Sequence, residues 1–84
     1  MKEQYVFPAI FTEEQRGIAI EFPDLPGCLP CADNYEQAFR NAREALHLHL
    51  TGMIEDGEKI PSPSKLAAIP LETGSALALI ETQI

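Results

Sequence analysis

The stretch Phe22–Cys28 (Phe-Pro-Asp-Leu-Pro-Gly-Cys) constrains the fold of this chain more than any other. Proline fixes φ at about −65° and glycine accepts positive φ, so residues 25–28 have the composition of a type II turn. Because the residue before a proline is driven towards extended backbone, Phe22 is expected to end a strand. The stretch therefore predicts a stiff loop with apolar tips and little charge, between a strand and a later helix. Turn chemistry accounts for most of its composition, and a contact surface is the second interpretation.

Two strands joined as a hairpin are expected before this loop. Residues 4–11 are rich in the aromatic and β-branched types that strands prefer. Alternation puts Val6 and Ile10 on one face and, on the other, Tyr5, Phe7, Ala9 and Phe11. Pro8 has no N–H to donate, so it should mark a bulge or a point where pairing on one side begins or stops. The polar residues 12–17 form the predicted connection, and residues 18–22 alternate as the second strand.

A long amphipathic helix is expected after a short third strand at Cys28–Ala32. Asp33-Asn34 offers an N-cap, and Gln37 stands where a capping box needs it. Gly57 is the expected end of the helix, with Gly52 as an earlier alternative. One face repeats at the i, i+3, i+4 and i+7 spacing and consists of Tyr35, Ala38, Phe39, Ala42, Ala45, Leu46, His49, Leu50 and Met53.

The elements together predict a single α+β domain over residues 1–84, in the order β-β-β-α-β. Residues 60–64 (Ile-Pro-Ser-Pro-Ser) form a stiff connection, residues 65–74 are ambiguous, and Ser75–Thr82 is apolar enough for a buried last strand. One mostly antiparallel sheet would carry the helix on one face. Because the helix is a crossover, the last strand can lie parallel to an earlier one. The opposite face would stay bare, which favours a homo-dimer or higher homo-oligomer, or another partner, that covers it.

The charge balance argues against several classes of function. Six basic against thirteen acidic residues give a net charge of −7, and no basic cluster is present to meet phosphates. Direct nucleic-acid binding by this chain is therefore not expected, whereas a basic protein partner is compatible with the acidity. No apolar run approaches the roughly 18 residues that span a bilayer, and the N-terminus lacks the features of a signal peptide. The expected compartment is the cytoplasm, where the two cysteines stay reduced.

The residues that carry chemistry do not assemble into an active site. Cys28 and Cys31 have the C-x-x-C spacing of thiol oxidoreductases and of half a zinc site, but the helix begins too late to activate Cys28. His47 is expected to face water and His49 to lie in the core. We therefore expect no catalytic residues, no metal and no cofactor, and we interpret the cysteines as small apolar side chains.

The quoted motifs carry a family resemblance. The segment 5–11, the loop 22–28, the helix pattern Asn41-Ala42-x-Glu44-Ala45-Leu46 and the segments 56–57 and 60–64 together resemble the HicB-like antitoxin family. The resemblance implies a degenerate ribonuclease-H-like fold. It also implies an antitoxin that binds and blocks a small basic HicA-like toxin, which cleaves messenger RNA. Many members carry a C-terminal DNA-binding segment, and because the chain stops after its last strand we expect that segment to be lacking.

Three hypotheses follow from these patterns. The leading one is the antitoxin of a type II toxin–antitoxin pair, which neutralises its toxin by protein–protein contact. If the family analogy holds, the expected partner-binding residues are Asp24, Leu25 and Pro26, with the acidic flank of the helix. The alternative is a stand-alone oligomeric regulatory or ligand-binding domain of the same fold with no toxin. An enzyme that uses the Cys28/Cys31 pair is the third and fits the context least.

Overall fold

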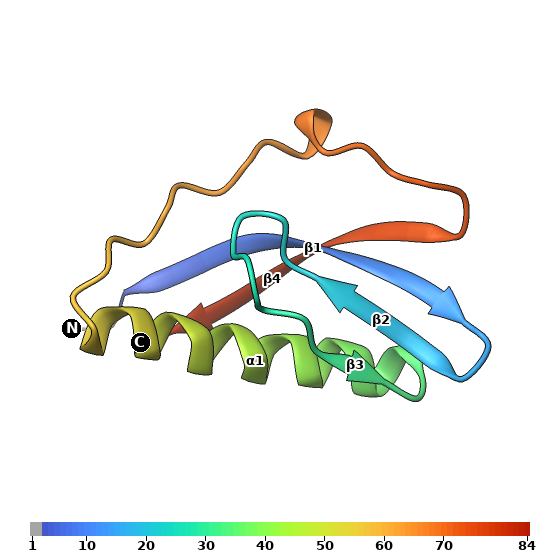
Figure 1. Cartoon of the computed structure of the whole chain (residues 1–84), viewed down its shortest axis with the longest axis horizontal. Helices are drawn as coiled ribbons and strands as arrows, with labels where there is room; N and C mark the ends of the chain where they lie inside the picture. Colours follow the sequence, from blue (N-terminus) through green and yellow to red (C-terminus); the bar gives the residue numbers. More distant parts are fainter. Residues whose placement is uncertain (1–2) are drawn as a thin grey trace.

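The computed structural model describes residues 3–84, which form a four-stranded sheet with one long helix across it (Figure 1). The predicted α+β class and the predicted order of elements are confirmed. The elements are β1 (Gln4–Glu14), β2 (Gly17–Glu21), β3 (Cys31–Ala32), α1 (Tyr35–Glu55), a short 3₁₀ helix η1 (Leu66–Ala68) and β4 (Ser75–Gln83).

The sheet has the strand order β3-β2-β1-β4, and each neighbouring pair is antiparallel. The last strand pairs antiparallel with β1 and therefore runs in the same direction as β2, an earlier strand, as the sequence allowed. Pairing extends from Gln4↔Gln83 to Thr12↔Ser75. The crossover leads from one edge of the sheet to the other, since α1 follows β3 at one edge and the chain returns beside β1 at the other.

Pro8 lies within the central strand β1, at the point where pairing on one side begins, as predicted. It stands opposite Leu79 of β4, whereas pairing with β2 begins only at Ile10↔Glu21. Glu3 and Ile84 exchange both backbone hydrogen bonds at 2.9 Å, so in this ladder the odd-numbered residues of β1 bond to β4. The nitrogen of Pro8 faces the other side, beyond the end of β2, where no ladder bond is lost.

The turn of the hairpin and the third strand are both shorter than the sequence indicates. β1 continues to Glu14, which pairs with Gly17, so only Gln15 and Arg16 form the turn. β2 ends at Glu21, one residue before the predicted Phe22. β3 is only two residues long because Pro30 cannot donate a ladder bond, although its carbonyl oxygen accepts one from the Ile20 N–H at 3.0 Å.

Both predicted ends of α1 are confirmed. The Asn34 side chain accepts a hydrogen bond from the Gln37 N–H at 2.9 Å, and the Gln37 side chain accepts one in return from the Asp33 N–H at 3.2 Å. At the other end Gly57 has φ +74°, and the N–H groups of Gly57 and Glu58 donate to Ile54 and Met53. This is a Schellman arrangement, and the helix passes through Gly52 without interruption.

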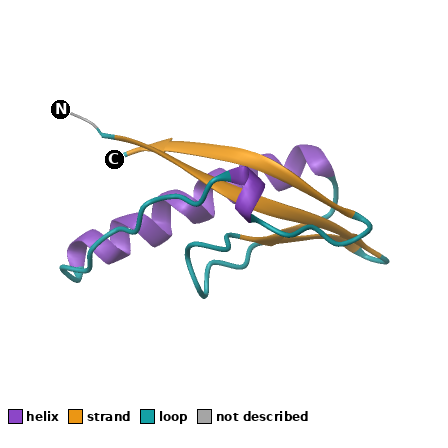
Figure 2. Cartoon of the chain, turned by 90° about the horizontal axis from the view of Figure 1, so that it is seen from above, coloured by secondary structure: helices purple, strands orange, loops and turns teal. Residues whose placement is uncertain are grey.

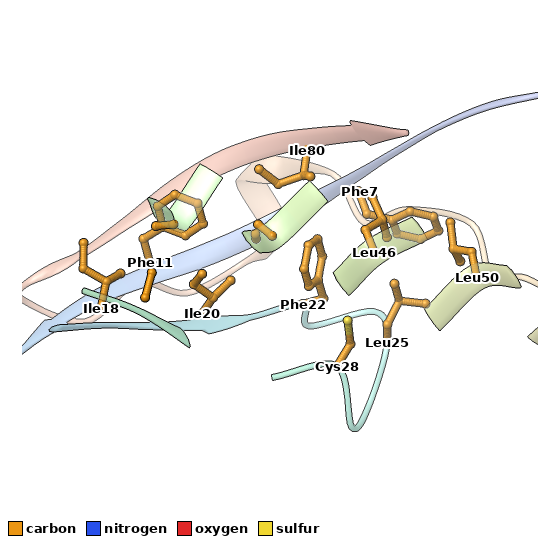
Figure 3. Packing of buried hydrophobic residues seen from close by; sticks show 14 residues of the cluster. Phe7, Phe11, Ile18, Ile20, Phe22, Leu25, Cys28, Leu46, Leu50 and Ile80 are labelled. Carbon is orange, nitrogen blue, oxygen red and sulfur yellow. The ribbon is translucent and has the colours of Figure 1, made fainter. Parts of the chain in front are cut away.

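The core lies between α1 and the facing side of the sheet. Ala38, Ala42, Leu46 and Leu50 of α1 have no exposed surface. Figure 3 shows the aromatic and aliphatic side chains that meet them, among them Phe7, Phe11, Ile18, Ile20, Phe22 and Ile80. Tyr35 and Phe39 belong to the predicted apolar stripe but are 40% and 49% exposed, because they lie at the margin of the sheet against one side of the Phe11 ring.

The opposite face of the sheet is partly covered by the chain itself, which corrects the expectation of a bare face. The connection between α1 and β4 runs along the side of the sheet away from the helix (Figures 1 and 2). Its residues Ala68 and Ile69 line a hollow together with Ile10 and Thr12 of β1. Pro8, which also points to this face, is less than 2% exposed. Sequence patterns could not predict this cover because the segment has no periodicity of its own.

The two cysteines lie in different environments. Cys28 is 4% exposed and its thiol donates weakly to the Ala45 carbonyl oxygen at 3.8 Å, whereas Cys31 on β3 is exposed. Burial raises the pKa of the Cys28 thiol. A buried thiol with a raised pKa forms less of the reactive thiolate. The C-x-x-C spacing therefore separates one core side chain from one surface side chain.

We predict that Gly17→Ala destabilises the protein by about 2 kcal/mol or more. Gly17 has φ +143°, and a Cβ there would lie 2.3 Å from the backbone oxygen of Ala32. The matched control is Gly74→Ala, which also has positive φ, +89°, but has no atom within 4 Å of the added Cβ. Urea unfolding should give a lower midpoint for Gly17→Ala than for the control. Equal midpoints would contradict the proposed close approach.

We predict that the two thiols of the folded protein react with a disulfide reagent at different rates. At pH 8, a disulfide reagent should modify Cys31 at least about tenfold faster than Cys28, since Cys28 is buried and its pKa is raised. Cys31→Ser should remove the fast phase, while the matched variant Cys28→Ser should retain it. If both thiols reacted at the same rate without denaturant, the burial of Cys28 in the folded protein would be contradicted.

Candidate functional site

The proline loop, residues 22–28, forms the turn that its composition predicts. The Cys28 N–H donates to the Leu25 carbonyl oxygen at 3.1 Å, and Gly27 has φ +90°, which is the third position of a type II turn. A second turn precedes it, because the Leu25 N–H donates to the Phe22 carbonyl oxygen at 2.9 Å. The loop is thus fixed by backbone bonds at both ends.

The three predicted contact residues share this loop but have different environments. Leu25 is only 1% exposed, and Figure 3 shows it with Cys28 beside the same cluster as Phe22. Its side chain anchors the loop to the core, so the expectation of an apolar surface tip is wrong for Leu25. Pro26 is exposed and Asp24 is half-buried.

A clasp between Asp24 and Ser64 holds the proline loop to the segment that follows α1. The Ser64 N–H donates to Asp24 Oδ2 at 2.9 Å, and the Ser64 hydroxyl donates to Asp24 Oδ1. A carboxylate that accepts two hydrogen bonds is held in one orientation. Sequence analysis did not single out Ser64, because the contact joins residues 40 positions apart and no local pattern marks it.

A groove runs between the proline loop and the C-terminal half of α1, and we name it the loop–helix groove. Its walls combine acidic groups with apolar side chains, and Lys59 is the one Lys or Arg in its lining. Leu48 on its helix wall is 64% exposed. The lining residues are Asp24, Leu25, Pro26, Leu48, His49, Gly52, Met53, Asp56, Glu58, Lys59 and Pro61. The groove therefore brings the predicted loop residues beside an acidic end of the helix.

Neither histidine lies where the sequence analysis expected it. His47, expected in water, is half-buried, and its Nδ1 lies 3.1 Å from the Thr82 hydroxyl of β4. Its position shows that this helix face turns towards the edge strand. His49, expected in the core, is also half-buried and lines the loop–helix groove.

The described part of the chain shows no arrangement suited to a metal ion. Within residues 3–84, no three side chains of the His, Cys, Asp or Glu type come together closely enough to hold one. Over the same residues, no helix is both long enough and apolar enough to cross a membrane.

Comparison with known sequences gives a consistent relationship. The family described as "HicB_like antitoxin of bacterial toxin-antitoxin system" matches residues 7–80. Antitoxin HicB 2 of Photorhabdus laumondii is 28% identical over 88 aligned positions, which cover 100% of this chain and 63% of that protein. Two further relatives, a 14.9 kDa protein of Haemophilus phage HP1 and antitoxin HicB 1 of Photorhabdus laumondii, are covered over 46% of their lengths. The chain thus spans about half to two thirds of these relatives.

Comparison with solved structures agrees. The N-terminal domain of the Burkholderia pseudomallei antitoxin HicB has a TM-score of 0.72 at 29% identity, with 90% of this chain and 95% of that chain covered. The same fold occurs in a HicA3 and HicB3 toxin–antitoxin complex, at a TM-score of 0.72 and 23% identity, with the same coverage. From the family match over residues 7–80, the chain belongs to the HicB-like antitoxin family of bacterial toxin–antitoxin systems.

Proposed function

We propose that this chain is the toxin-binding domain of a type II toxin–antitoxin pair. It binds a small basic HicA-like ribonuclease in the bacterial cytoplasm and blocks it by protein–protein contact, without catalysis of its own. The observation that carries the proposal is the family match over residues 7–80. A similar fold has been solved in a HicA3 and HicB3 complex, which supports a toxin of that type as the partner.

The net charge supports a basic partner. At −7, the chain attracts a cationic protein over several ångströms of solvent, and complementary charge speeds encounter and rejects acidic competitors. A ribonuclease must be basic where it holds phosphates, so the same surface that binds RNA is the one that an acidic inhibitor can cover.

The loop–helix groove is the contact surface that we propose. Its rim carries Asp56 and Glu58, and Asp24 adds a third acid on the loop side. Pro26 and Leu48 supply exposed apolar surface between these charges. An apolar patch surrounded by charge is typical of protein interfaces, where the apolar part supplies affinity and the charges supply specificity. Leu25 acts from beneath, by holding the loop in place.

We predict that the chain protects its host from the small basic protein encoded beside it. Co-expression of the two should relieve growth arrest, and affinity capture of the chain should retain the basic protein as a stable complex. If no basic protein is captured and the neighbouring protein is harmless alone, the antitoxin function fails for this chain. The stand-alone oligomeric domain would then be the better description.

The groove is tested with the double variant Asp56→Lys/Glu58→Lys. We expect the complex to weaken by about tenfold or more, because two favourable charge contacts become repulsive. Folding should persist, since both residues are exposed and a cation at the helix C-terminus suits its dipole. The matched control Glu14→Lys/Glu44→Lys changes the net charge equally at exposed residues outside the groove. Equal weakening in both variants would assign the effect to net charge and exclude the groove.

A further inference from the structure

The free edge of β4 has little of the protection that exposed edge strands usually carry. β4 is nine residues long, lies at the end of the sheet order and pairs there with β1 alone. Its register with β1 is continuous, so it has no bulge, and it contains no proline. Glu81 is its one charged residue. Proteins normally blunt such an edge with charges, proline, bulges or a very short strand. The opposite edge strand, β3, has only two residues.

The register shows which backbone groups of β4 are free. Ile84 exchanges both of its backbone hydrogen bonds with Glu3, so even-numbered residues of β4 bond to β1. The N–H and C=O groups of the odd-numbered residues therefore point to the open edge. Ser75 uses its N–H in a turn with Glu72. For Leu77, Leu79 and Glu81, no backbone hydrogen bond outside the β1 ladder is found within residues 3–84.

We propose that this edge pairs with the β4 edge of a second copy, in antiparallel orientation, to form one continuous eight-stranded sheet. Antiparallel pairing about a two-fold axis requires hydrogen-bonding residues of the same parity to face each other. The odd-numbered residues meet that requirement. The midpoint of Ser75–Gln83 is Leu79, which is also an odd-numbered residue and is 58% exposed. A junction centred there pairs residues 77–81 of both strands.

The side chains around the edge suit a second copy. In the register centred on Leu79, Leu77 of one copy faces Glu81 of the other, so the two Glu81 carboxylates are not directly opposite. A hollow beside the edge is lined by Val6, Phe39, Arg43, Leu79, Ile80 and Glu81. An axis perpendicular to the sheet keeps both helices on one side. The half-exposed Phe39 rings then lie beside the junction and can be covered by it.

Charge favours a second copy over the basic partner at this edge. The hollow holds one acid, Glu81, and one base, Arg43, in a protein whose net charge is −7. Self-association is least opposed where the local charges cancel, while a cationic protein gains most where acids gather. The edge and the loop–helix groove share no lining residue. The inference therefore does not depend on the toxin.

The first test measures association of the full chain by sedimentation over a range of concentrations. We expect a dimer that dissociates on dilution and that Leu79→Lys weakens by at least tenfold, since two lysines would meet at the axis. The control is Leu66→Lys, at a leucine 43% exposed in η1, which should leave the dimer intact. A monomer at every concentration, or a dimer that Leu79→Lys does not weaken, would overturn the proposal.

The second test identifies the interface even if a variant folds poorly. Amide hydrogen exchange of the unaltered chain should change with period two along β4. The amides of Leu77, Leu79 and Glu81 should exchange more slowly as concentration rises, while those of Ala78 and Ile80 are already protected by β1 at every concentration. A dimer in which the odd-numbered amides stay fast would place the interface elsewhere.

Discussion

The contact between α1 and the sheet is the interaction on which the rest of this structure depends. Ala38 and Ala42 place no bulk beyond Cβ in the interface, so the helix backbone lies close enough for Phe7 and Phe11 to fill the remaining space. In folded proteins most of the stability of a helix comes from packing of its apolar face, which for α1 is the contact with the sheet. Because α1 also connects β3 to β4, its position determines which strand occupies each edge of the sheet.

The loop–helix groove is a consequence of that contact. Leu25 and Cys28 extend the core beyond the end of β2, so the proline loop lies against the C-terminal half of α1 rather than in solvent. The clasp between Asp24 and Ser64 then ties the later segment to the same loop. Three parts of the chain thus form one surface. The groove is fixed in the free chain, which reduces the entropy that binding would cost.

Local features of the sequence predicted local features of the fold. The type II turn, the Asn34 cap, the Gly57 end of α1 and the position of Pro8 each depend on a few neighbouring residues, and all are found. The errors concern contacts between distant segments. Burial of Leu25 and the contact of His47 with Thr82 depend on where the crossover returns. Propensity and periodicity carry no information about that path. The same limit applies to the groove: the proline loop and the acidic flank of the helix were expected to share one surface, but the residues of the helix wall could not be named from the sequence.

The distribution of charge explains how one acidic chain can present two different surfaces. Between exposed groups, repulsion is screened beyond about 8–10 Å at physiological salt, so only charges close to a junction oppose it. Near the β4 edge these are one acid and one base, Glu81 and Arg43. The acids of the groove lie on the proline loop and after the C-terminal end of α1, and none of them lines the hollow beside the β4 edge. Pairing at β4 would leave both grooves open. A dimer would then offer a basic partner two sites without giving up any of the charge that attracts it.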